Sequence, residues 1–255
     1  MFFFRKAKCK AGNPLRTVLY TWTRTGASSL TAILSMHPDI RAIGEPFNPS
    51  QSHGQFVKNK NDKEFRLILD NLWREYNFIK HNHGLTKKQE EFLLTRSCNK
   101  VIFLWRRNSA KRVISNQLAK QTRIWNINNN PENKLKLMDF NYNPIEIKNI
   151  LDEINNYLVS IETIRNFLRK NHVDYIELVY EDIYENNLDS GMMIISNLFN
   201  FLGLDANLSE EIIEKIHWRL EPDNFKQSTP DIYNKIPNII EINTLLSNKG
   251  YGSLF

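Results

Sequence analysis

Residues 17–49 place a strand, a small polar turn and a helix in direct succession, and this order constrains the fold more than any other feature. The run 17–21 is short and β-branched, which favours a strand. The turn after it consists of Arg24, Thr25, Gly26, Ala27, Ser28 and Ser29. Apolar residues at helical spacing follow from Leu30, so the first N–H groups of a helix are predicted to face an anion at this turn.

A second unit of the same kind lies further along the chain. Residues 100–105 are an uninterrupted apolar run typical of a buried parallel strand, and a polar turn separates them from a helical pattern that reaches Leu118. Further strands are predicted at 41–44 and 173–179, and further helices at 62–80, 144–170 and 192–202. Strands that alternate with helices predict an α/β fold, a central parallel β-sheet flanked by helices that binds ligands at the carboxyl ends of its strands.

The composition indicates one globular domain over residues 1–255. A hydrophobic content of 41% and a charged content of 24% are ordinary for a folded protein. The net charge of +6 suits a polyanionic partner, although an unspecialised basic surface explains it equally well. The asparagine-rich stretch 122–143 has no clear period, and we expect it to be a surface loop or lid.

We expect a cytoplasmic protein without a metal cofactor or a membrane partner. The two cysteines, Cys9 and Cys98, lack the spacing of a zinc site or a disulfide framework. The longest apolar run, 101–105, is far shorter than the ~20 residues of a membrane span. A non-catalytic RNA or polyanion binder would explain the basic charge, but no paired aromatic and basic motif predicts nucleic acid as a partner.

The first turn also invites comparison with the phosphate loop of kinases and ATPases. That loop requires a Gly-Lys pair followed by Ser or Thr, with the lysine on the terminal phosphates. Here Ala27 follows Gly26, and the basic residue, Arg24, precedes the glycine. A P-loop nucleotide-binding kinase or NTPase therefore remains an alternative that the residues weaken.

The first turn and the residues after it resemble a known family of enzymes. Arg24-Thr25-Gly26-Ala27-Ser28-Ser29-Leu30 is followed by His37-Pro38 and then by Glu45-Pro46-Phe47. This series is similar to the 5′-phosphosulfate loop of sulfotransferases that use 3′-phosphoadenosine 5′-phosphosulfate (PAPS), in the bacterial and Golgi-type branches of the family.

Two later segments strengthen the resemblance. Arg107-Asn108 closes the buried strand 100–105, and Ser115 lies eight positions after the arginine, as in the 3′-phosphate site of that family. Residues 179–183 and 201–204 are similar to its Tyr-Glu-Asp-Leu and Phe-Leu-Gly-Leu segments, which we expect to shape the core.

The resemblance implies a P-loop-like sulfotransferase fold and a PAPS-dependent enzyme that releases adenosine 3′,5′-bisphosphate (PAP) without a metal. The acceptor would be a small molecule or a carbohydrate, chosen by loops such as 51–60 and 122–143. The residues expected to bind the nucleotide are Arg24, Thr25, Gly26, Ala27, Ser28, Ser29, Arg107 and Ser115. The residue that stacks on adenine is left open, and the closing Lys249-Gly250 is more typical of a helix C-cap than of a nucleotide-binding segment.

Two residues are expected to take part in catalysis. Arg24 would stabilise charge on the leaving phosphate, and Glu45, the proposed base in that branch, would take the acceptor's proton. A structural ion pair between Glu45 and an arginine is a rival interpretation. His37 is expected to be structural, and His53, His81 and His83 are expected in polar loops. Trp125, Phe47 and Tyr142 are interpreted equally well as pocket or core residues.

Overall fold

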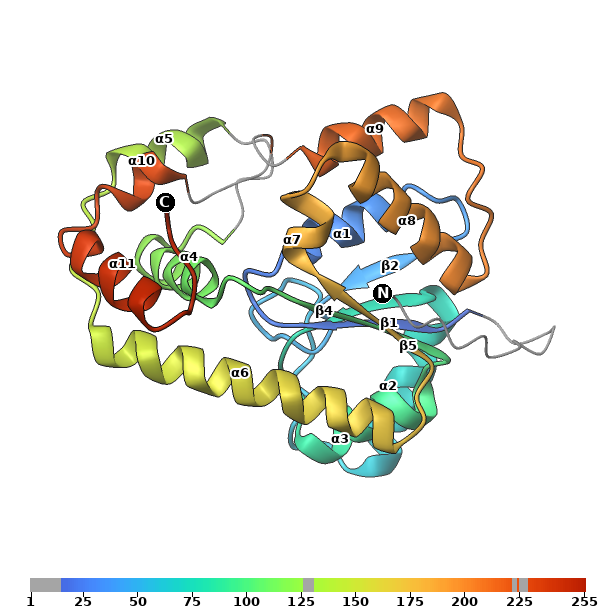
Figure 1. The fold of residues 1–255 in the computed structure, drawn as a ribbon. Helices are drawn as coiled ribbons and strands as arrows, with labels where there is room; N and C mark the ends of the chain where they lie inside the picture. Colours follow the sequence, from blue (N-terminus) through green and yellow to red (C-terminus); the bar gives the residue numbers. More distant parts are fainter. Residues whose placement is uncertain (1–14, 126–130, 222–223, 225–228) are drawn as a thin grey trace.

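The computed structural model describes residues 15–125, 131–221, 224 and 229–255, and its centre is a five-stranded sheet (Figure 1). The strands are β1 (Thr17–Thr21), β2 (Ala42–Gly44), β3 (Phe78–His81), β4 (Lys100–Trp105) and β5 (Tyr175–Val179). They lie in the order β2-β3-β1-β4-β5, and every neighbouring pair is parallel. The predicted central parallel sheet flanked by helices is confirmed.

The strand order places a topological switch point between β1 and β4. Every residue of β1 is buried, since β3 and β4 pair with it on its two sides. The chain leaves β1 toward β2 at one edge of the sheet, whereas it leaves β4 toward β5 at the other edge. The chain therefore leaves β1 and β4 in opposite directions, and open α/β sheets have their ligand-binding crevice at such a point.

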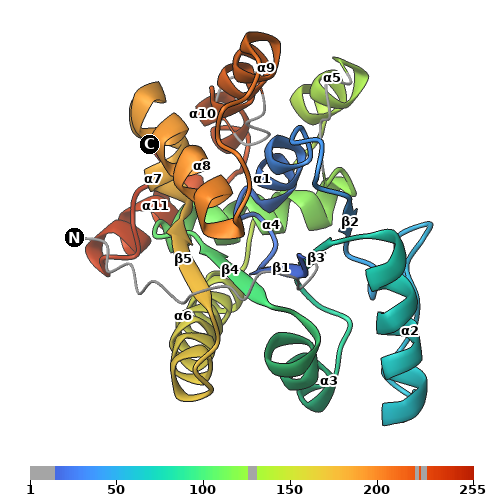
Figure 2. The same ribbon diagram turned by 90° about the vertical axis from the view of Figure 1, so that its right-hand side faces the viewer.

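Helices cover both faces of the sheet (Figure 2). One face carries α1 (Ala27–Leu34), α7 (Tyr180–Tyr184), α8 (Leu188–Leu202) and α9 (Glu210–Leu220). The other face carries α2 (Asp62–Glu75), α3 (Lys87–Phe92) with its π-helical continuation Leu93–Ser97, and the second half of α6 (Ile147–Lys170). The two apolar layers meet the sheet through alternate residues of β1, with Leu19 in the first core and Val18 in the second.

A third apolar cluster lies beyond the carboxyl ends of the strands. It joins the first half of α6 to α4 (Ser109–Thr122), α5 (Pro131–Asp139), α10 (Pro230–Tyr233) and α11 (Ile239–Asn248). Figure 1 shows these helices grouped on one side of the molecule, next to the end of β4. Ile154 and Ile242 are fully buried there. This cluster fixes α4, and with it one wall of the crevice.

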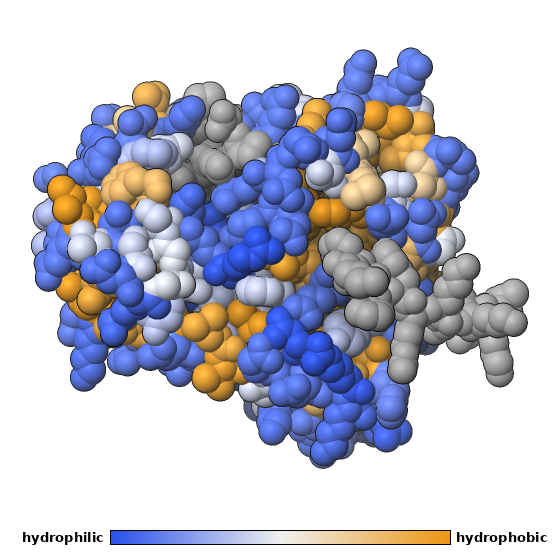
Figure 3. All heavy atoms as spheres, viewed as in Figure 1, coloured by the Kyte–Doolittle hydropathy of each residue, from blue (hydrophilic) through white to orange (hydrophobic). Residues whose placement is uncertain are grey.

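The described helices do not include one long and apolar enough to cross a membrane. Figure 3 shows that the surface on this side is mostly hydrophilic, with small apolar patches over α6 and around α8 and α9. Val159 on α6, Met193 on α8 and Trp218 on α9 are exposed apolar residues in these elements.

The expected single helix over 62–80 is wrong, because α2 ends at Glu75 and β3 follows at Phe78. Tyr76 takes an extended conformation with φ −119° and ψ 154°, which ends the helix. Phe78 and Ile79 then pair with both β1 and β2. Two apolar residues are too short a run for periodicity to separate a strand from a helix.

The stretch 122–143 is not only a loop, because residues 131–139 form α5, whereas 126–130 lie outside the described residues. Helix α6 begins at Ile147 rather than at Pro144, because Glu146 is extended at φ −72° and ψ 119° and is the N-cap of the helix. Gly203 ends α8 in a left-handed conformation, as the sequence predicts.

Candidate functional site

The loop between β1 and α1 exposes the start of a helix at the crevice. Gly26 is the N-cap of α1 at φ 80° and ψ 6°, and Arg24 is also left-handed at φ 66°. The helix has no side-chain cap and no acidic residue in its first turn. Its first internal bond runs from the Leu30 N–H to the Gly26 carbonyl, which leaves the preceding N–H groups and the positive end of the helix dipole for an anion.

Two tyrosines of α7 pack against this loop and require a glycine in it. A Cβ at Gly26 would lie 2.7 Å from Cδ2 of Tyr180 and 2.9 Å from Cε2 of Tyr184. The Tyr184 hydroxyl also donates to the Gly26 carbonyl at 3.3 Å. The tyrosine pair therefore sets how closely the loop approaches α7.

We expect Gly26→Ala to destabilise the fold by about 2 to 4 kcal/mol, because the new methyl group meets a buried ring and the left-handed backbone is strained. Gly203→Ala is the matched control, since Gly203 has φ +77° but nothing within 4 Å of an added Cβ. Urea unfolding measures both. Equal losses in the two variants would show that the tyrosine contact contributes nothing.

The predicted hydroxyl donors of the loop are not equivalent. Thr25 is buried, and its hydroxyl contacts Thr21 Oγ1 at 2.5 Å and donates to the Trp22 carbonyl at 2.8 Å. The Ser29 hydroxyl lies against the phenol of Tyr184. Ser28 is exposed, so it is the loop hydroxyl that an anion reaches most directly.

Arg24 joins the first loop to helix α4. Its Nε donates to Ser115 Oγ at 2.7 Å, and its Nη1 donates to the Trp125 carbonyl at 2.7 Å. Both acceptors are uncharged. Arg24 and Ser115 belong to the two separate phosphate motifs of the sequence, so the fold brings these motifs into direct contact.

The guanidinium of Arg24 is poorly compensated by negative charge. Burial, and to a smaller extent the cation of Arg106, lower the pKa of Arg24 to about 10, so it stays protonated at neutral pH. In the described part of the chain, no carboxylate lies within salt-bridge distance of it. A partly buried cation without a counter-ion is costly, and a bound anion would relieve that cost.

Glu45 lies at the end of β2 in an ion pair with Lys80, the third residue of β3. The Lys80 Nζ is 2.8 Å from Glu45 Oε1 and donates to Ser28 Oγ at 3.0 Å. Asn48 Nδ2 donates to the other carboxylate oxygen at 2.8 Å. Burial raises the pKa of Glu45, but the Lys80 ammonium and these hydrogen bonds outweigh it and hold the pKa below its ordinary value.

Sequence reasoning missed Lys80. A lysine at the end of the predicted helix 62–80 would face solvent, whereas the side chain is 10% exposed at the carboxyl end of a strand. The signal that would have found it is the apolar pair Phe78 and Ile79 after Asn77, which begins a new element. The alternative interpretation is that Glu45 forms a structural ion pair with an arginine. Glu45 does form an ion pair, but its partner is a lysine.

The turn after β4 forms the second wall of the crevice. Asn108 caps α4 by accepting from the Lys111 N–H at 2.8 Å, and the first turn of α4 has no acidic residue. Arg107 is 59% exposed and its Nη2 donates to Asp182 at 2.9 Å. Ser115 is buried and faces Arg24. Arg107 thus lies in the turn and Ser115 in the helix that follows it, but the Arg107 side chain forms its ion pair with α7.

The neighbouring Arg106 is buried and weakly paired. Its guanidinium carbon lies 4.2 Å from the ring centre of Tyr180. The closest oxygens of Glu181 and Glu185 are 3.7 and 3.6 Å away, which is beyond a good hydrogen bond. Its Nε has no hydrogen-bond partner among the described residues. Arg106 therefore adds positive potential behind the crevice.

The last residues of the chain lie against the start of α4. Gly250, at φ +74°, follows the C-cap Lys249 of α11, so the predicted C-cap role is confirmed. The Tyr251 carbonyl accepts from the Ala110 N–H at 3.1 Å. A Cβ at Gly252 would lie 2.6 Å from Asn108 Oδ1, so this segment also borders the second turn.

A family model described as Stf0 sulphotransferase matches residues 81–220, more than half of the chain. The chain belongs to the Stf0 sulphotransferase family. The match includes Arg107 and Ser115, whereas Arg24 and Glu45 lie before it. The predicted sulfotransferase family is thereby confirmed.

Two solved structures are similar to this chain at low identity. One is mouse sulfotransferase SULT7A1 complexed with PAP, with 15% identity, a TM-score of 0.43, and coverage of 84% of this chain and 66% of the mouse chain. The other is the sulfotransferase domain from the Synechococcus PCC 7002 olefin synthase, with 14% identity, a TM-score of 0.36, and coverage of 100% and 93%. The chain thus spans slightly less than two thirds of the mouse protein. No curated protein sequence matches it.

The histidines of the chain lie in different settings. His37 is buried after α1, with Nε2 3.1 Å from the Asp205 carbonyl oxygen, in a structural setting. The expected loop position of His81 is wrong, because it ends β3 fully buried with Nε2 3.0 Å from Glu90 Oε1. His53 and His83 are exposed. Partial desolvation by neighbouring groups lowers the pKa of His83, although the nearby Glu45 opposes this shift.

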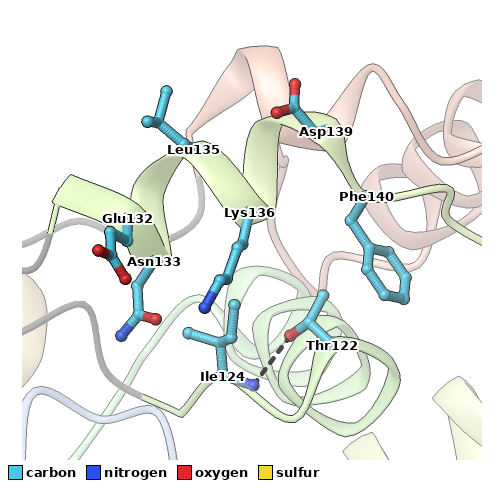
Figure 4. Close-up of a pocket in the computed structure, with 8 residues that line it drawn as sticks. All are labelled: Thr122, Ile124, Glu132, Asn133, Leu135, Lys136, Asp139 and Phe140. Carbon is cyan, nitrogen blue, oxygen red and sulfur yellow. Dashed lines mark hydrogen bonds between the residues drawn. The ribbon is translucent and has the colours of Figure 1, made fainter.

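A surface pocket of about 680 Å³ lies between α5 and the end of α4 (Figure 4). It is lined by Thr122, Ile124, Glu132, Asn133, Leu135, Lys136, Asp139 and Phe140. In Figure 4, Lys136 points toward Ile124, whereas Leu135 and Asp139 point away from it. Trp125 next to it is 45% exposed, but Phe47 and Tyr142 are buried in the core.

Proposed function

We propose that the protein transfers a sulfuryl group from PAPS to a hydroxyl or amine of a small-molecule or carbohydrate acceptor and releases PAP. The observation that carries the proposal is the 2.7 Å hydrogen bond from Arg24 Nε to Ser115 Oγ. It joins two anion-binding turns at the switch point of a parallel sheet. A nucleotide with phosphates at both the 5′ and the 3′ positions needs two adjacent sites of this kind.

The first loop is proposed to hold the 5′-phosphosulfate. The N–H groups of Gly26, Ala27, Ser28 and Ser29 begin helix α1, and Thr25 contributes its backbone because its hydroxyl is bonded internally. Arg24 gains an anionic partner that it lacks in the ligand-free protein. Lys80 already reaches Ser28 at 3.0 Å and is placed to contact the sulfuryl oxygens.

The second turn is proposed to hold the 3′-phosphate through Arg107 and Ser115. The Arg107–Asp182 ion pair is exposed, so a phosphate replaces it at little cost in free energy. Arg106 supports binding through its positive charge, since its nearest carboxylates stand off at 3.6 and 3.7 Å. A guanidinium is suited to a phosphate because its donors form a fixed planar fork.

Sulfuryl transfer resembles phosphoryl transfer, so the protein contributes mainly positioning and charge stabilisation. The acceptor oxygen or nitrogen forms a bond to sulfur, and the bond from sulfur to the phosphate oxygen breaks. The acceptor's proton goes to Glu45, and the negative charge that develops on PAP is stabilised by Arg24, Lys80 and the loop N–H groups.

The Glu45–Lys80 ion pair is proposed to couple donor binding to base strength. In the ligand-free protein Lys80 holds Glu45 ionised but weakly basic. The sulfuryl group competes for the lysine, and a carboxylate released from its counter-ion has a higher pKa. Glu45 thus becomes a stronger base when the donor is present. The pocket next to Trp125, whose carbonyl binds Arg24, supports an acceptor approach from the α5 side.

The proposed 3′-phosphate site predicts that its variants affect the affinities for two nucleotides differently. Arg107→Ala and Ser115→Ala should each weaken PAP by about tenfold or more, since each removes a donor to a charged group. Arg107→Ala should not weaken adenosine 5′-phosphate, which lacks the 3′-phosphate, whereas Ser115→Ala should weaken it less than PAP, because Ser115 also holds Arg24 of the first loop. Isothermal titration of both nucleotides checks this. Equal losses for the two nucleotides would place the 3′-phosphate elsewhere.

The activity itself is tested with radiolabelled PAPS and a panel of hydroxyl and amine acceptors, with PAP release as the second readout. We expect label transfer that depends on acceptor and on Glu45. ATP hydrolysis without PAPS turnover would instead support the P-loop kinase or NTPase alternative.

A further inference from the structure

Glu153 on α6 accepts hydrogen bonds from four side chains of the facing helix α4. Its Oε1 accepts from Arg112 Nη2 at 3.2 Å and from Asn116 Nδ2 at 2.7 Å. Its Oε2 accepts from Gln117 Nε2 at 3.0 Å and from Lys120 Nζ at 3.1 Å. The carboxylate is 21% exposed, so it lies in the groove between the two helices.

Two of these four side chains also reach the first loop. Arg112 Nη1 donates to the Thr23 carbonyl at 3.3 Å, and Asn116 Oδ1 accepts from the Thr23 hydroxyl at 3.2 Å. Thr23 directly precedes Arg24. The carbonyl and the hydroxyl of one loop residue are thus held by two side chains whose other ends bind Glu153.

The carboxylate decides how these side chains face. An asparagine amide has a donor end and an acceptor end, and Glu153 takes the donor end of Asn116, which turns Oδ1 toward Thr23. Arg112 is buried with the Tyr157 ring 4.0 Å from its guanidinium carbon, and Glu153 is its carboxylate partner. Without Glu153 both side chains lose the contact that orients them.

The loop needs this support because Arg24 is a left-handed residue that is not glycine, at φ 66°. Such a conformation costs free energy and persists only where the surroundings determine it. Arg24 must also keep its Nε on Ser115. Hydrogen bonds that fix Thr23 therefore restrain both the backbone conformation of Arg24 and the position of its side chain.

We propose that Glu153 is a positioning residue that fixes the Thr23–Arg24 backbone in its donor-binding conformation through Arg112 and Asn116. The link to catalysis rests on the proposed function of the first loop. The restraint itself does not, since it concerns contacts within the ligand-free protein.

Hydrogen–deuterium exchange and titration with PAP test the two parts separately. In Glu153→Gln we expect peptides over 22–30 to exchange about tenfold faster and PAP to bind about tenfold more weakly. The KM for PAPS should rise by the same factor, while the KM for the acceptor stays unchanged. Asn116→Ala should give the same loop exchange with the Glu153–Lys120 contact intact.

Two controls remove charges that do not touch the loop. Lys120→Met deletes a partner of Glu153 that does not contact Thr23, and Glu162→Gln deletes an exposed ion pair with Arg165 on the same helix. Both should leave exchange over 22–30 and PAP affinity at the wild-type values. Unchanged loop exchange in both Glu153→Gln and Asn116→Ala would overturn the proposal. Faster loop exchange in a protein whose wild type does not bind PAP would support the restraint and reject the proposed function.

Discussion

Glu45→Gln is expected to lower kcat by about 10³ while PAP affinity stays the same or increases. The amide cannot accept the acceptor's proton, and general-base catalysis contributes roughly 10² to 10⁴ in rate. The change also frees Lys80 from its 2.8 Å ion pair, so that the lysine is available to the nucleotide. Single-turnover kinetics with saturating PAPS, together with titration of PAP, measure both effects.

The matched control is Glu177→Gln, which removes another partly buried glutamate from an ion pair, in this case with Arg165 on the far side of β5. It should leave kcat unchanged. A Glu45→Gln variant with full turnover would leave Glu45 a purely structural partner of Lys80.

The pH profile distinguishes Glu45 from a histidine base. Because the Lys80 ammonium holds the pKa of Glu45 below its ordinary value, the carboxylate is ionised over the whole neutral range. Activity is present above that pKa and is lost as pH falls through it, so kcat/KM, which reports the free enzyme, should have no acid limb in the neutral range. An acid limb in the range where histidines titrate would point to His83 instead.

Arg24→Ala is expected to weaken PAP by about 100-fold without destabilising the ligand-free protein. Hydrogen bonds between charged groups contribute roughly 1.5 to 3 kcal/mol each, and Arg24 is placed to make more than one with a phosphate. Without the nucleotide the same guanidinium is partly buried near Arg106 with uncharged acceptors only, so its removal relieves an electrostatic cost.

Arg123→Ala is the control for this variant, because Arg123 is also left-handed, at φ 59°, but is exposed at the end of α4. It should bind PAP normally. Titration calorimetry measures the affinities, and urea unfolding without ligand measures the stabilities. An Arg24→Ala protein that keeps its PAP affinity would show that the first loop does not use the guanidinium.

The sequence predicted those parts of the site that local pattern encodes. Strands β1 and β4 are apolar runs with a polar turn and a helix directly after them, and we propose that anions bind at the helix starts. Gly26 lies in the predicted turn, and the structure adds that its backbone is left-handed and that Tyr180 excludes any side chain there.

The missed parts depend on contacts between distant segments. The role of Lys80 was missed because a run of two apolar residues does not distinguish a strand from the end of a helix. Only pairing with β1 and β2 makes Phe78 and Ile79 part of a strand. The Arg24–Ser115 bond spans 91 residues, and no periodicity encodes it. The contrast between buried Arg106 and exposed Arg107 likewise arises only when α7 packs beside the turn.

The central claim is that the two turns form one site for a nucleotide phosphorylated at both ribose positions. Titration calorimetry of the wild-type protein with PAP, adenosine 5′-phosphate and adenosine 3′-phosphate tests it most directly. We expect one PAP per chain, bound at least about 100-fold more tightly than either monophosphate, because each phosphate has its own charged donors. PAP affinity no greater than that of the better monophosphate would contradict the account.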